Sequence, residues 1–451
     1  MSDVRTNRYL EGLYAPVDVE RTDLDLQVTG TLPVELDGRY LRIGPNPLGE
    51  VDPATYHWFT GDGMVHGIRL QDGQARWYRN RWVRSDSLAA RLGEAPPAGE
   101  IHAGMDVVNT NVIGHAGRTF AVVEAGSRPV ELTDELETVG RTDLDGTLPH
   151  GYSAHPKRDP RTGELHAVSY YWGRPELLEY TVIGTDGRVR RRVDVPVPGN
   201  PMVHDCALTE SFIALLDLPV TFNLEHAMAG GTFPYTWDDE YGARLGLLPL
   251  EAGADDVEWY DLDPCFVFHP LNAYDDGDDV VLEVVRHPRM FDRNRLGPNE
   301  GSPTLWRWTV DRAAGRVREE QLDDRPIEFP RVDERLVGRR HRFGWAAHLS
   351  VEDDDLEFGP NGLIRYDHQT GRSEEISFGP GTTPGEAVFV PRSDGAAEDD
   401  GWYLTFVHDR ATDLSSLAVL DASAPGEGPV ATVHLPARVP LGFHGNWVPT
   451  A

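Results

Sequence analysis

The sequence has few cysteines, a single lysine and no long apolar run, and each shortage excludes a class of protein. Two cysteines in 451 residues, Cys206 and Cys265, are too few for a disulfide framework. They indicate a reducing compartment, so we expect a cytoplasmic protein. The longest apolar run, 212–220, is too short to span a bilayer, and the first residues lack the apolar core of a signal peptide.

Basic residues are scarce relative to acidic ones. Lysine and arginine total 42 against 74 aspartates and glutamates, which gives a formal net charge of −32, and Lys157 is the only lysine. Because nucleic acids bind basic patches, a nucleic-acid-binding function is excluded, and electrostatic docking to anionic lipid is disfavoured. The acidic residues are spread along the chain, which is typical of a solvated, salt-tolerant surface. No obligate protein partner is evident.

Helical periodicity is also rare, being confined to 87–94 and part of 224–248. Short alternating strands instead follow turn signals such as QDGQA (71–75) and TDGR (185–188). Many short strands in one undivided chain favour an all-β propeller over a sandwich, although spacing alone does not set the number of blades. We therefore expect one domain over 1–451, with surplus loops forming a cap that includes about 221–250.

Four of the seventeen histidines share one local pattern. Each follows small or apolar residues and precedes a turn or a change of chain direction: His155 in GYSAHP, His204 in NPMVHDC, His269 in FVFHP and His444 in PLGFHGNW. A single such histidine is ordinarily a core residue bonded to backbone. Four buried imidazoles, however, need partners for eight ring nitrogens, and one metal ion satisfies four of these at once. The axis of a propeller is a place where such distant residues can meet.

Two other interpretations concern the same residue types. Five further histidines lie in polar or turn-like segments and look ordinary: His102, His115, His287, His368 and His434. A closed zinc site could also be built from two histidines and both cysteines: His204, Cys206, Cys265 and His269. Their spacings differ from those of common zinc modules, and that site leaves His155 and His444 without a role.

Five more segments, spread along nearly the whole chain, have distinctive sequences. They are GRYLRIGPNP (38–47), YHWFTGDGMVHGI (56–68), NTNVIGHAGRTFAVVEAG (109–126), PGEAVFVPR (384–392) and EDDGWYL (398–404). With the four histidine segments, they resemble the carotenoid cleavage oxygenase family, which includes stilbene-cleaving dioxygenases and a retinoid isomerase. The resemblance implies a seven-bladed β-propeller with a cap of loops and short helices over an axial metal. It also implies non-haem Fe(II) held by four histidines, matching His155, His204, His269 and His444.

The resemblance further assigns residues around the ion. Four neutral imidazoles leave an octahedral Fe(II) two open positions, as binding of O₂ requires. Three family glutamates, each accepting a ring N–H from a ligand, match Glu124, Glu328 and Glu386. Glu328 lies between Arg325 and Arg331, which is equally typical of a surface residue. A family threonine beside a vacant iron position matches Thr110, for which a plain strand role is at least as good.

The family implies an apolar substrate. Its members use O₂ to cleave a conjugated C=C bond of a polyene or a stilbene into two carbonyl products, so we expect an apolar tunnel. Candidate lining residues are aromatic: Phe59, Trp58, Phe268, Phe443 and Phe233. Stilbene cleavers have a lysine immediately before the position of Glu124, where this chain has Val123. A carotenoid or apocarotenoid substrate is therefore favoured, with a stilbenoid as the alternative.

Polyenes dissolve in membranes, which predicts peripheral contact with a lipid surface. The apolar segment 227–237 is a candidate for this contact, and a role in the tunnel wall or cap interior is equally good. Two further functions stay open at this level: a metal-free propeller that acts as a binding module, and isomerisation without O₂. The sequence does not fix which double bond is cleaved or which metal is bound.

Overall fold

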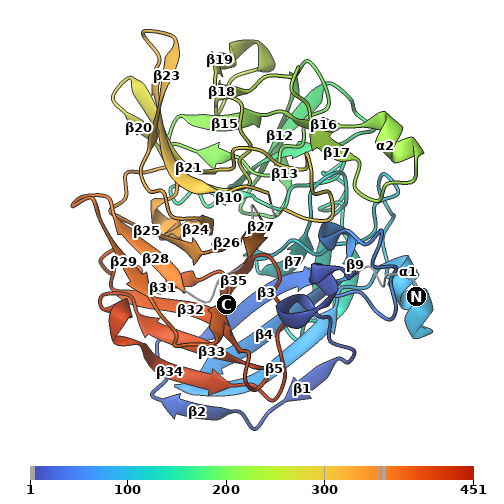
Figure 1. Cartoon of the computed structure of the whole chain (residues 1–451), viewed down its shortest axis with the longest axis vertical. Helices are drawn as coiled ribbons and strands as arrows, with labels where there is room; N and C mark the ends of the chain where they lie inside the picture. The colour runs from blue at the N-terminus through green and yellow to red at the C-terminus, as the bar shows by residue number, and fades with distance from the viewer. Residues whose placement is uncertain (1–5, 299, 353–354, 358–361, 451) are drawn as a thin grey trace.

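Seven β-sheets surround a central axis in the computed structural model, which describes residues 6–298, 300–352, 355–357 and 362–450. Within these residues each of the seven sheets has four to six strands (Figure 1). The chain passes from one sheet to the next around the ring, as the change of colour in Figure 1 shows. The fold is the seven-bladed β-propeller that the family resemblance implies.

The blades are named by their order in the chain. Blade 1 contains β1 (Arg21–Asp23), β3 (Gly38–Pro45), β4 (Gly63–Gln71), β5 (Gln74–Trp82) and β35 (Gly445–Pro449). Blade 2 contains β6 (Asn111–His115), β7 (Arg118–Val122), β8 (Val130–Leu132) and β9 (Thr138–Arg141). Blade 3 contains β10 (Lys157–Arg158), β11 (Leu165–Tyr170), β12 (Leu177–Ile183) and β13 (Val189–Pro196). Blade 4 contains β14 (Ala207–Leu208), β15 (Phe212–Asp217), β18 (Arg244–Pro249) and β19 (Glu258–Asp261).

The remaining blades follow in the same way. Blade 5 contains β20 (Pro270–Asp276), β21 (Asp279–Arg286), β22 (Thr304–Asp311) and β23 (Arg316–Gln321). Blade 6 contains β24 (Ile327–Val332), β25 (Phe343–His348), β28 (Leu363–Asp367) and β29 (Arg372–Ile376). Blade 7 contains β30 (Thr382–Pro384), β31 (Val388–Pro391), β32 (Gly401–Asp409), β33 (Leu414–Asp421), β34 (Pro429–His434) and β2 (Gln27–Gly30). Two hairpins lie outside the blades: β16 (Val220–Phe222) with β17 (Tyr235–Trp237), and β26 (Ser350–Glu352) with β27 (Asp355–Glu357).

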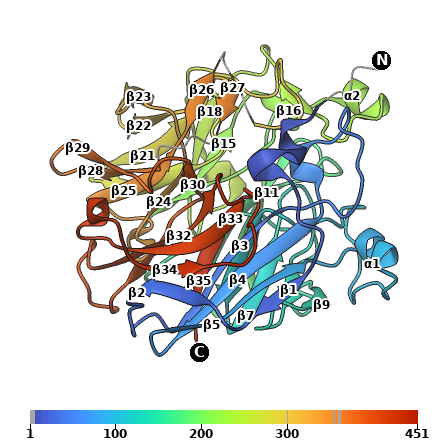
Figure 2. The same ribbon diagram turned by 60° about the horizontal axis from the view of Figure 1, so that its bottom comes forward.

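The two ends of the chain close the ring. Strand β2, from the beginning of the chain, pairs with β34 in blade 7, and β35, from the end, pairs with β3 in blade 1. Figure 2 shows β2 in blue beside β34 in red. Because each end completes a blade built mostly from the other end, opening the ring would expose two unpaired strands, which is unfavourable.

Turn chemistry and shared cores explain why these segments form blades. Between β4 and β5, Asp72 and Gly73 have φ values of 52° and 66°, the left-handed backbone that a tight hairpin needs. One hydrophobic cluster then joins Tyr180, Leu247 and Trp308 of three successive blades. Burial of such side chains contributes roughly 1.5–3 kcal/mol each, so neighbouring blades stabilise one another.

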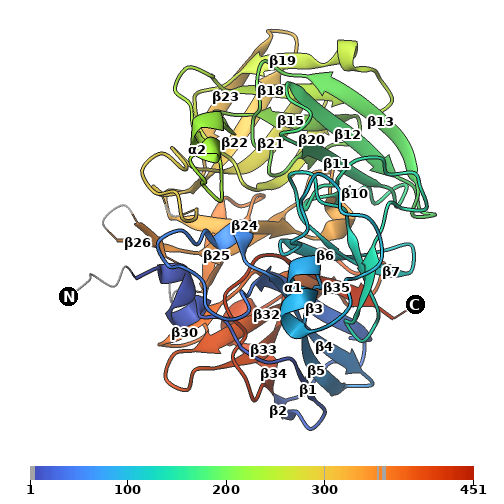
Figure 3. The same cartoon turned by 90° about the vertical axis from the view of Figure 1, so that its right-hand side faces the viewer.

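Helices are short and lie outside the sheets. The sequence predicts a helix at 87–94, and α1 (Asp86–Leu92) forms there, capped by Ser85 and ended by Gly93 at φ 73°. In 224–248 only α2 (Leu224–Met228) is helical. Both helices lie on the side of the molecule that faces the viewer in Figure 3. The structure also has short 3₁₀ segments: η1 (Arg8–Leu10), η2 (Gly12–Tyr14), η3 (Trp58–Thr60), η4 (Ala254–Asp256), η5 (Glu334–Leu336) and η6 (Pro425–Glu427).

The expected cap segment, about 221–250, is an insertion for most of its length. The β16–β17 hairpin and α2 lie between two strands of blade 4, β15 and β18. Residues 244–249, however, form β18 itself, because Leu245 and Leu247 alternate into the blade core. None of the helices in the described part of the chain has the length and apolarity needed to cross a bilayer.

Candidate metal centre

Each blade contributes one residue that lies at or shortly before the start of its innermost strand. Four histidines, two glutamates and a threonine make up this set: Thr110, His155, His204, His269, Glu328, Glu386 and His444. Thr110 directly precedes β6, His269 directly precedes β20, and His444 directly precedes β35. These inner strands contact one another around the ring, for example β35 with β6 and β20 with β24. The repeated blade therefore brings residues that are distant in sequence to one place.

The four predicted histidines do converge. All four rings are buried, and one nitrogen of each lies within 4.8 Å of the nitrogens chosen from the other three. The Nε2 atoms of His204 and His269 are 3.2 Å apart. The ring of His155 lies 4.4 Å from that of His204 and 4.6 Å from that of His444, centre to centre. Imidazole nitrogens this close to one another are typical ligands of a single ion.

Three of the histidines are oriented by the glutamates that the family resemblance assigns to them. The Nδ1 atom of each ring lies within hydrogen-bond distance of one carboxylate oxygen: His204 with Glu124 at 2.9 Å, His269 with Glu328 at 2.5 Å, and His444 with Glu386 at 3.0 Å. A proton on Nδ1 leaves Nε2 with a lone pair. The bonds to carboxylate thus direct the lone pairs of three rings into the cluster.

His155 differs from the other three. Its Nδ1 atom is 3.9 Å from Oδ2 of Asp205, which is too far for a hydrogen bond. The same oxygen accepts a hydrogen bond of 2.8 Å from Nζ of Lys157, the only lysine of the chain. The Nε2 atom of His155 is buried without a hydrogen-bond partner, which fits a nitrogen that binds a metal ion.

The electrostatics favour neutral rings at His155 and His444 and an ionised carboxylate at Glu386. Burial, followed by the neighbouring His204 and His444, holds the pKa of His155 well below its ordinary value. Burial lowers the pKa of His444 to about 4, although Glu386 partly opposes it. Burial alone would raise the pKa of Glu386, but Arg331 and His444 outweigh it and lower that pKa to about 2. At neutral pH these groups are therefore a neutral ligand and a carboxylate.

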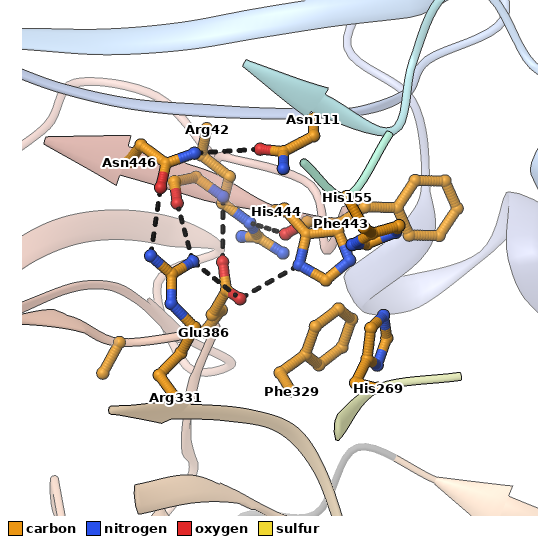
Figure 4. Close-up of polar contacts among 12 residues, drawn as sticks. Arg42, Asn111, His155, His269, Phe329, Arg331, Glu386, Phe443, His444 and Asn446 are labelled. Atoms are coloured by element: carbon orange, nitrogen blue, oxygen red, sulfur yellow. Dashed lines mark hydrogen bonds and ion pairs between the residues drawn. The ribbon is translucent and has the colours of Figure 1, made fainter. Parts of the chain in front are cut away.

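Glu386 has partners on two sides, as Figure 4 shows. Its Oε1 atom lies 3.0 Å from Nδ1 of His444 and 3.2 Å from Nη1 of Arg331. Arg331 also contacts Oδ1 of Asn446, at 3.0 Å. The carboxylate is therefore held in place while it orients the histidine.

The surface interpretation of Glu328 is wrong. Its side chain is buried against His269 and His287, while Arg331 pairs with Glu386 and Arg325 pairs with Asp323. Neither flanking arginine draws Glu328 to the surface. Burial would raise the pKa of Glu328, but His269 and His287 outweigh it and hold that pKa well below the ordinary value.

The donor set fits a metal ion with open positions and does not fit the closed zinc site. Four imidazoles with three oriented Nδ1 atoms form one group, and neither cysteine takes part in it. The Sγ atom of Cys206 contacts the carbonyl oxygen of His155, at 3.9 Å. Burial raises the pKa of each thiol to about 12, as expected for cysteines packed in an apolar core. The alternative based on His204, Cys206, Cys265 and His269 is thus wrong.

An apolar cavity opens beside the four histidines. Its walls include four of the predicted aromatic residues: Trp58, Phe59, Phe268 and Phe443. Thr110 and Phe329 also line it, together with His204, His269 and His444. The ring of Phe59 is 6.5 Å from that of His204, centre to centre. A molecule in this cavity would contact hydrocarbon on most sides and the histidines on one.

Two predicted tunnel residues do not line this cavity. Phe233 lies behind it, stacked on His57 at 4.1 Å and 5.6 Å from Phe59, both measured between ring centres. Val123 is half-buried and packs against the core between blades 1 and 2. The contact of Val123 with a substrate stays a prediction.

A second, polar cavity reaches the same histidines. Its walls include His155, His269 and His444 together with charged and amide side chains: Lys157, Asp205, Arg331, Glu334 and Asn446. The histidines therefore separate an apolar space from a polar one. The only lysine of the chain lies in the polar cavity, where it is paired with Asp205.

The sequence gives no signal for His287. This residue, which looks ordinary in HPRM, is fully buried, and its Nε2 atom lies 2.9 Å from Oε1 of Glu328. Glu328 therefore joins two histidines, His269 through one oxygen and His287 through the other. A pattern of apolar residues before a turn could not reveal this pair, because His287 follows a strand rather than preceding one.

Comparison with known proteins places this geometry in context. The family model described as "Retinal pigment epithelial membrane protein" (RPE65) matches residues 14–449. A carotenoid cleavage oxygenase of Mycobacterium tuberculosis is 48% identical over 497 aligned positions, covering 98% of both chains. A carotenoid 9,10(9',10')-cleavage dioxygenase of Crocus sativus is 34% identical, covering 98% of this chain and 89% of its own.

Solved structures agree with the fold. The lignostilbene dioxygenase of Pseudomonas brassicacearum superposes with a TM-score of 0.87 and 28% identity, covering 98% of both chains. Cobalt-substituted apocarotenoid oxygenase of Synechocystis superposes with a TM-score of 0.86 and 26% identity, covering 96% of this chain and 97% of its own. The similarity extends over nearly the whole chain in each case.

Proposed function

Because this chain belongs to the carotenoid cleavage oxygenase (RPE65) family, we propose that it is an Fe(II)-dependent dioxygenase that cleaves a conjugated C=C bond of a carotenoid or apocarotenoid. The reaction would consume O₂ and give two aldehyde or ketone products. The observation that supports it best is the convergence of His155, His204, His269 and His444, three of them oriented by carboxylates.

The residues present would hold iron in a suitable state. Bound by four neutral imidazoles, Fe(II) would keep two positions open and supply the chemistry that activates O₂. Glu124, Glu328 and Glu386 offset the ion's charge and hold three ligand rings in place. The aromatic walls of the apolar cavity exclude water from the reacting bond, and burial there favours a hydrocarbon substrate.

The hydrogen bonds that each substrate needs favour a polyene over a hydroxystilbene. A hydroxystilbene would bury a phenol, whose hydroxyl group needs a hydrogen-bond partner. Position 123 is valine, and Lys157 faces the polar cavity, where Asp205 already binds it. Neither residue supplies a donor to the apolar cavity. Cleavage of a stilbenoid is the second candidate function, and the likeness to a lignostilbene dioxygenase supports it.

Exposed apolar side chains would contact the membrane in which a lipid-soluble substrate is dissolved. Leu224 and Met228 of α2 are 62% and 81% exposed, and Met228 lies within the segment 227–237. Trp172, which stacks on Phe222, is 47% exposed. We propose that these side chains form a peripheral contact with the membrane. Met228→Glu should weaken binding to neutral phosphatidylcholine vesicles, whereas Val34→Glu, at a site elsewhere that is 68% exposed, should not. Equal binding of both variants would remove the proposed contact.

Product analysis tests the reaction. Protein loaded with Fe(II) is incubated aerobically with a panel of carotenoids and apocarotenoids and, separately, with a hydroxystilbene, and the carbonyl products are identified. Aldehydes from the polyenes support the proposal, and aldehydes only from the stilbene support the second candidate. A changed double-bond geometry without uptake of O₂ would indicate isomerisation. If iron is bound and neither substrate consumes O₂, the proposed dioxygenase function is wrong.

A further inference from the structure

A second cluster of metal-binding side chains lies between blades 5 and 6. Glu283 is in β21, His341 shortly precedes β25, and His368 directly follows β28. One ligand atom of each lies within 4.8 Å of the others. Glu283 and His341 are buried, and the side chain of His368 is only 10% exposed. No residue of this cluster belongs to the four-histidine centre.

Each of the three residues has one buried polar atom without a hydrogen bond. These atoms are Oε2 of Glu283, Nε2 of His341 and Nε2 of His368. Nε2 of His341 lies 3.0 Å from Oε2 of Glu283, yet the pair does not have the geometry of a hydrogen bond. Ligands about 2.1 Å from one ion and at the tetrahedral angle to each other are roughly 3.4 Å apart, so this pair is slightly closer than two zinc ligands would be. Unsatisfied buried polar atoms are unfavourable, and one ion shared with His368 would satisfy those of Glu283 and His341.

The opposite atoms of Glu283 and His368 are already held. Oε1 of Glu283 accepts hydrogen bonds from Nε and Nη2 of Arg307, at 3.1 and 2.5 Å. Nδ1 of His368 is 3.3 Å from the same oxygen, and Nδ1 of His341 is 3.1 Å from Nδ2 of Asn272. These contacts leave Oε2 of Glu283 and Nε2 of His341 facing each other, and a ring nitrogen of His368 lies within 4.8 Å of one ligand atom of each.

We propose that Glu283, His341 and His368 bind a second divalent cation, one that suits two imidazoles and a carboxylate, such as Zn²⁺. The ion would connect blade 5, through Glu283, with blade 6, through both histidines. It would stabilise the ring of blades and does not depend on the proposed dioxygenase function. With three protein ligands, at least one position would remain for water.

A purely hydrogen-bonded cluster makes a different prediction. The two hydrogens of the Asn272 amide also point to the carbonyl oxygens of Leu336 and Arg339. If Asn272 nevertheless donates to Nδ1 of His341, Nε2 carries the hydrogen and can only donate it to Glu283. The positive charge of Arg307 would also suffice to neutralise the carboxylate. In that arrangement no ion binds.

Counting ions distinguishes the two arrangements. The protein is stripped with a chelator, reloaded with Zn²⁺ alone and analysed by native mass spectrometry. We expect two ions on the unchanged chain, one on Glu283→Gln, one on His269→Ala and none on the double variant. His166→Gln is the matched control and should keep two ions, since His166 is equally buried and contacts Tyr180 instead. One ion on the unchanged chain, or two on Glu283→Gln, would overturn the proposal.

A stability measurement covers the case in which a variant folds poorly. In the His269→Ala background, Zn²⁺ should raise the melting temperature, because only the second site remains. The rise should disappear when His341→Gln is added. A rise that persists in the double variant, or no rise in either, would also overturn the second site. Loss of dioxygenase activity alone would not affect it, since neither readout involves turnover.

Discussion

Nε2 of His287 lies 2.9 Å from Oε1 of Glu328, in the wall of the apolar cavity beside the four-histidine centre. The other oxygen of that carboxylate binds His269, so His287 positions a ligand through an intermediary. Replacing His287 by phenylalanine should leave Oε1 unpaired and loosen the orientation of His269. Loss of such an outer partner typically lowers metal affinity about 10–100-fold. Competition with a chelating dye measures the change.

A matched variant separates this effect from general damage to the core. His166→Phe removes an equally buried histidine whose partner, Tyr180, has no contact with the metal centre. It should change stability without changing metal affinity. Equal losses of affinity in the two variants would show that His287 has only a packing role.

Replacing one of the four clustered histidines should abolish iron retention, whereas replacing a histidine elsewhere should not. His269→Ala removes one of four ligand nitrogens and leaves Glu328 without its partner, so the protein should no longer retain iron after gel filtration. His102→Ala removes a half-buried ring that contacts the carbonyl oxygen of Gly126 and the rings of His150 and Tyr171, and iron should be retained. Iron is measured by inductively coupled plasma mass spectrometry. Equal iron contents would contradict the assigned centre.

The four histidines are predictable because a local pattern coincides with a feature of the fold. In a propeller each inner strand starts at the axis, so a polar residue between an apolar run and that strand, such as His269 or His444, lies near the axis. The hairpins are predictable for a similar reason, since an Asp-Gly pair between alternating segments, as at Asp72 and Gly73, is well suited to the left-handed backbone of a tight turn.

Contacts between blades are not predictable in this way. Glu328 contacts His287, and Glu283 contacts His341, across segments whose separation in the sequence carries no regular spacing. The neighbours of Glu328 also suggested exposure, yet Arg331 crosses to Glu386 instead. Burial of a charged residue depends on partners from other blades, which no local sequence window contains.

Acid should destabilise the protein partly through Asp159. This buried carboxylate accepts hydrogen bonds from the backbone and side chain of Arg161. Burial would raise the pKa of Asp159, but these bonds outweigh it and lower that pKa. The group therefore contributes stability that is complete above its unfolded pKa, about 4, and is lost as the pH falls through the folded value.

Urea denaturation of Asp159→Asn tests that sign. The difference in unfolding free energy between the unchanged chain and the variant should be constant from about pH 7 to pH 5 and should shrink toward pH 3. The same substitution at Asp186, an exposed turn residue, should give a small difference. A difference for Asp159 that grows in acid would contradict the assignment.

Salt should stabilise the folded chain. A net charge of −32 produces repulsion between surface carboxylates that the folded state concentrates. Raising KCl from about 0.1 M to about 1 M shortens the screening length from roughly 10 Å to 3 Å. Arginine–carboxylate pairs on the surface lose strength too, but each contributes only about 0–1 kcal/mol. Repulsion should dominate, so the melting temperature should rise with KCl, and a fall would show that the ion pairs matter more.

Thr110 offers a test of what shapes the apolar cavity beside the histidines. Its hydroxyl group donates a hydrogen bond to Oδ1 of Asn109, at 3.1 Å, which leaves the methyl group for the cavity. Thr110→Val keeps a methyl group there and should preserve kcat/KM, at a cost of about 1 kcal/mol of stability for the lost hydrogen bond. Thr110→Ser keeps the hydroxyl but opens space for water, so less aldehyde should form per O₂ consumed. An oxygen electrode combined with product quantification measures both. If the serine variant behaves as the unchanged chain and the valine variant is impaired, the hydroxyl rather than the methyl group is the functional part of Thr110.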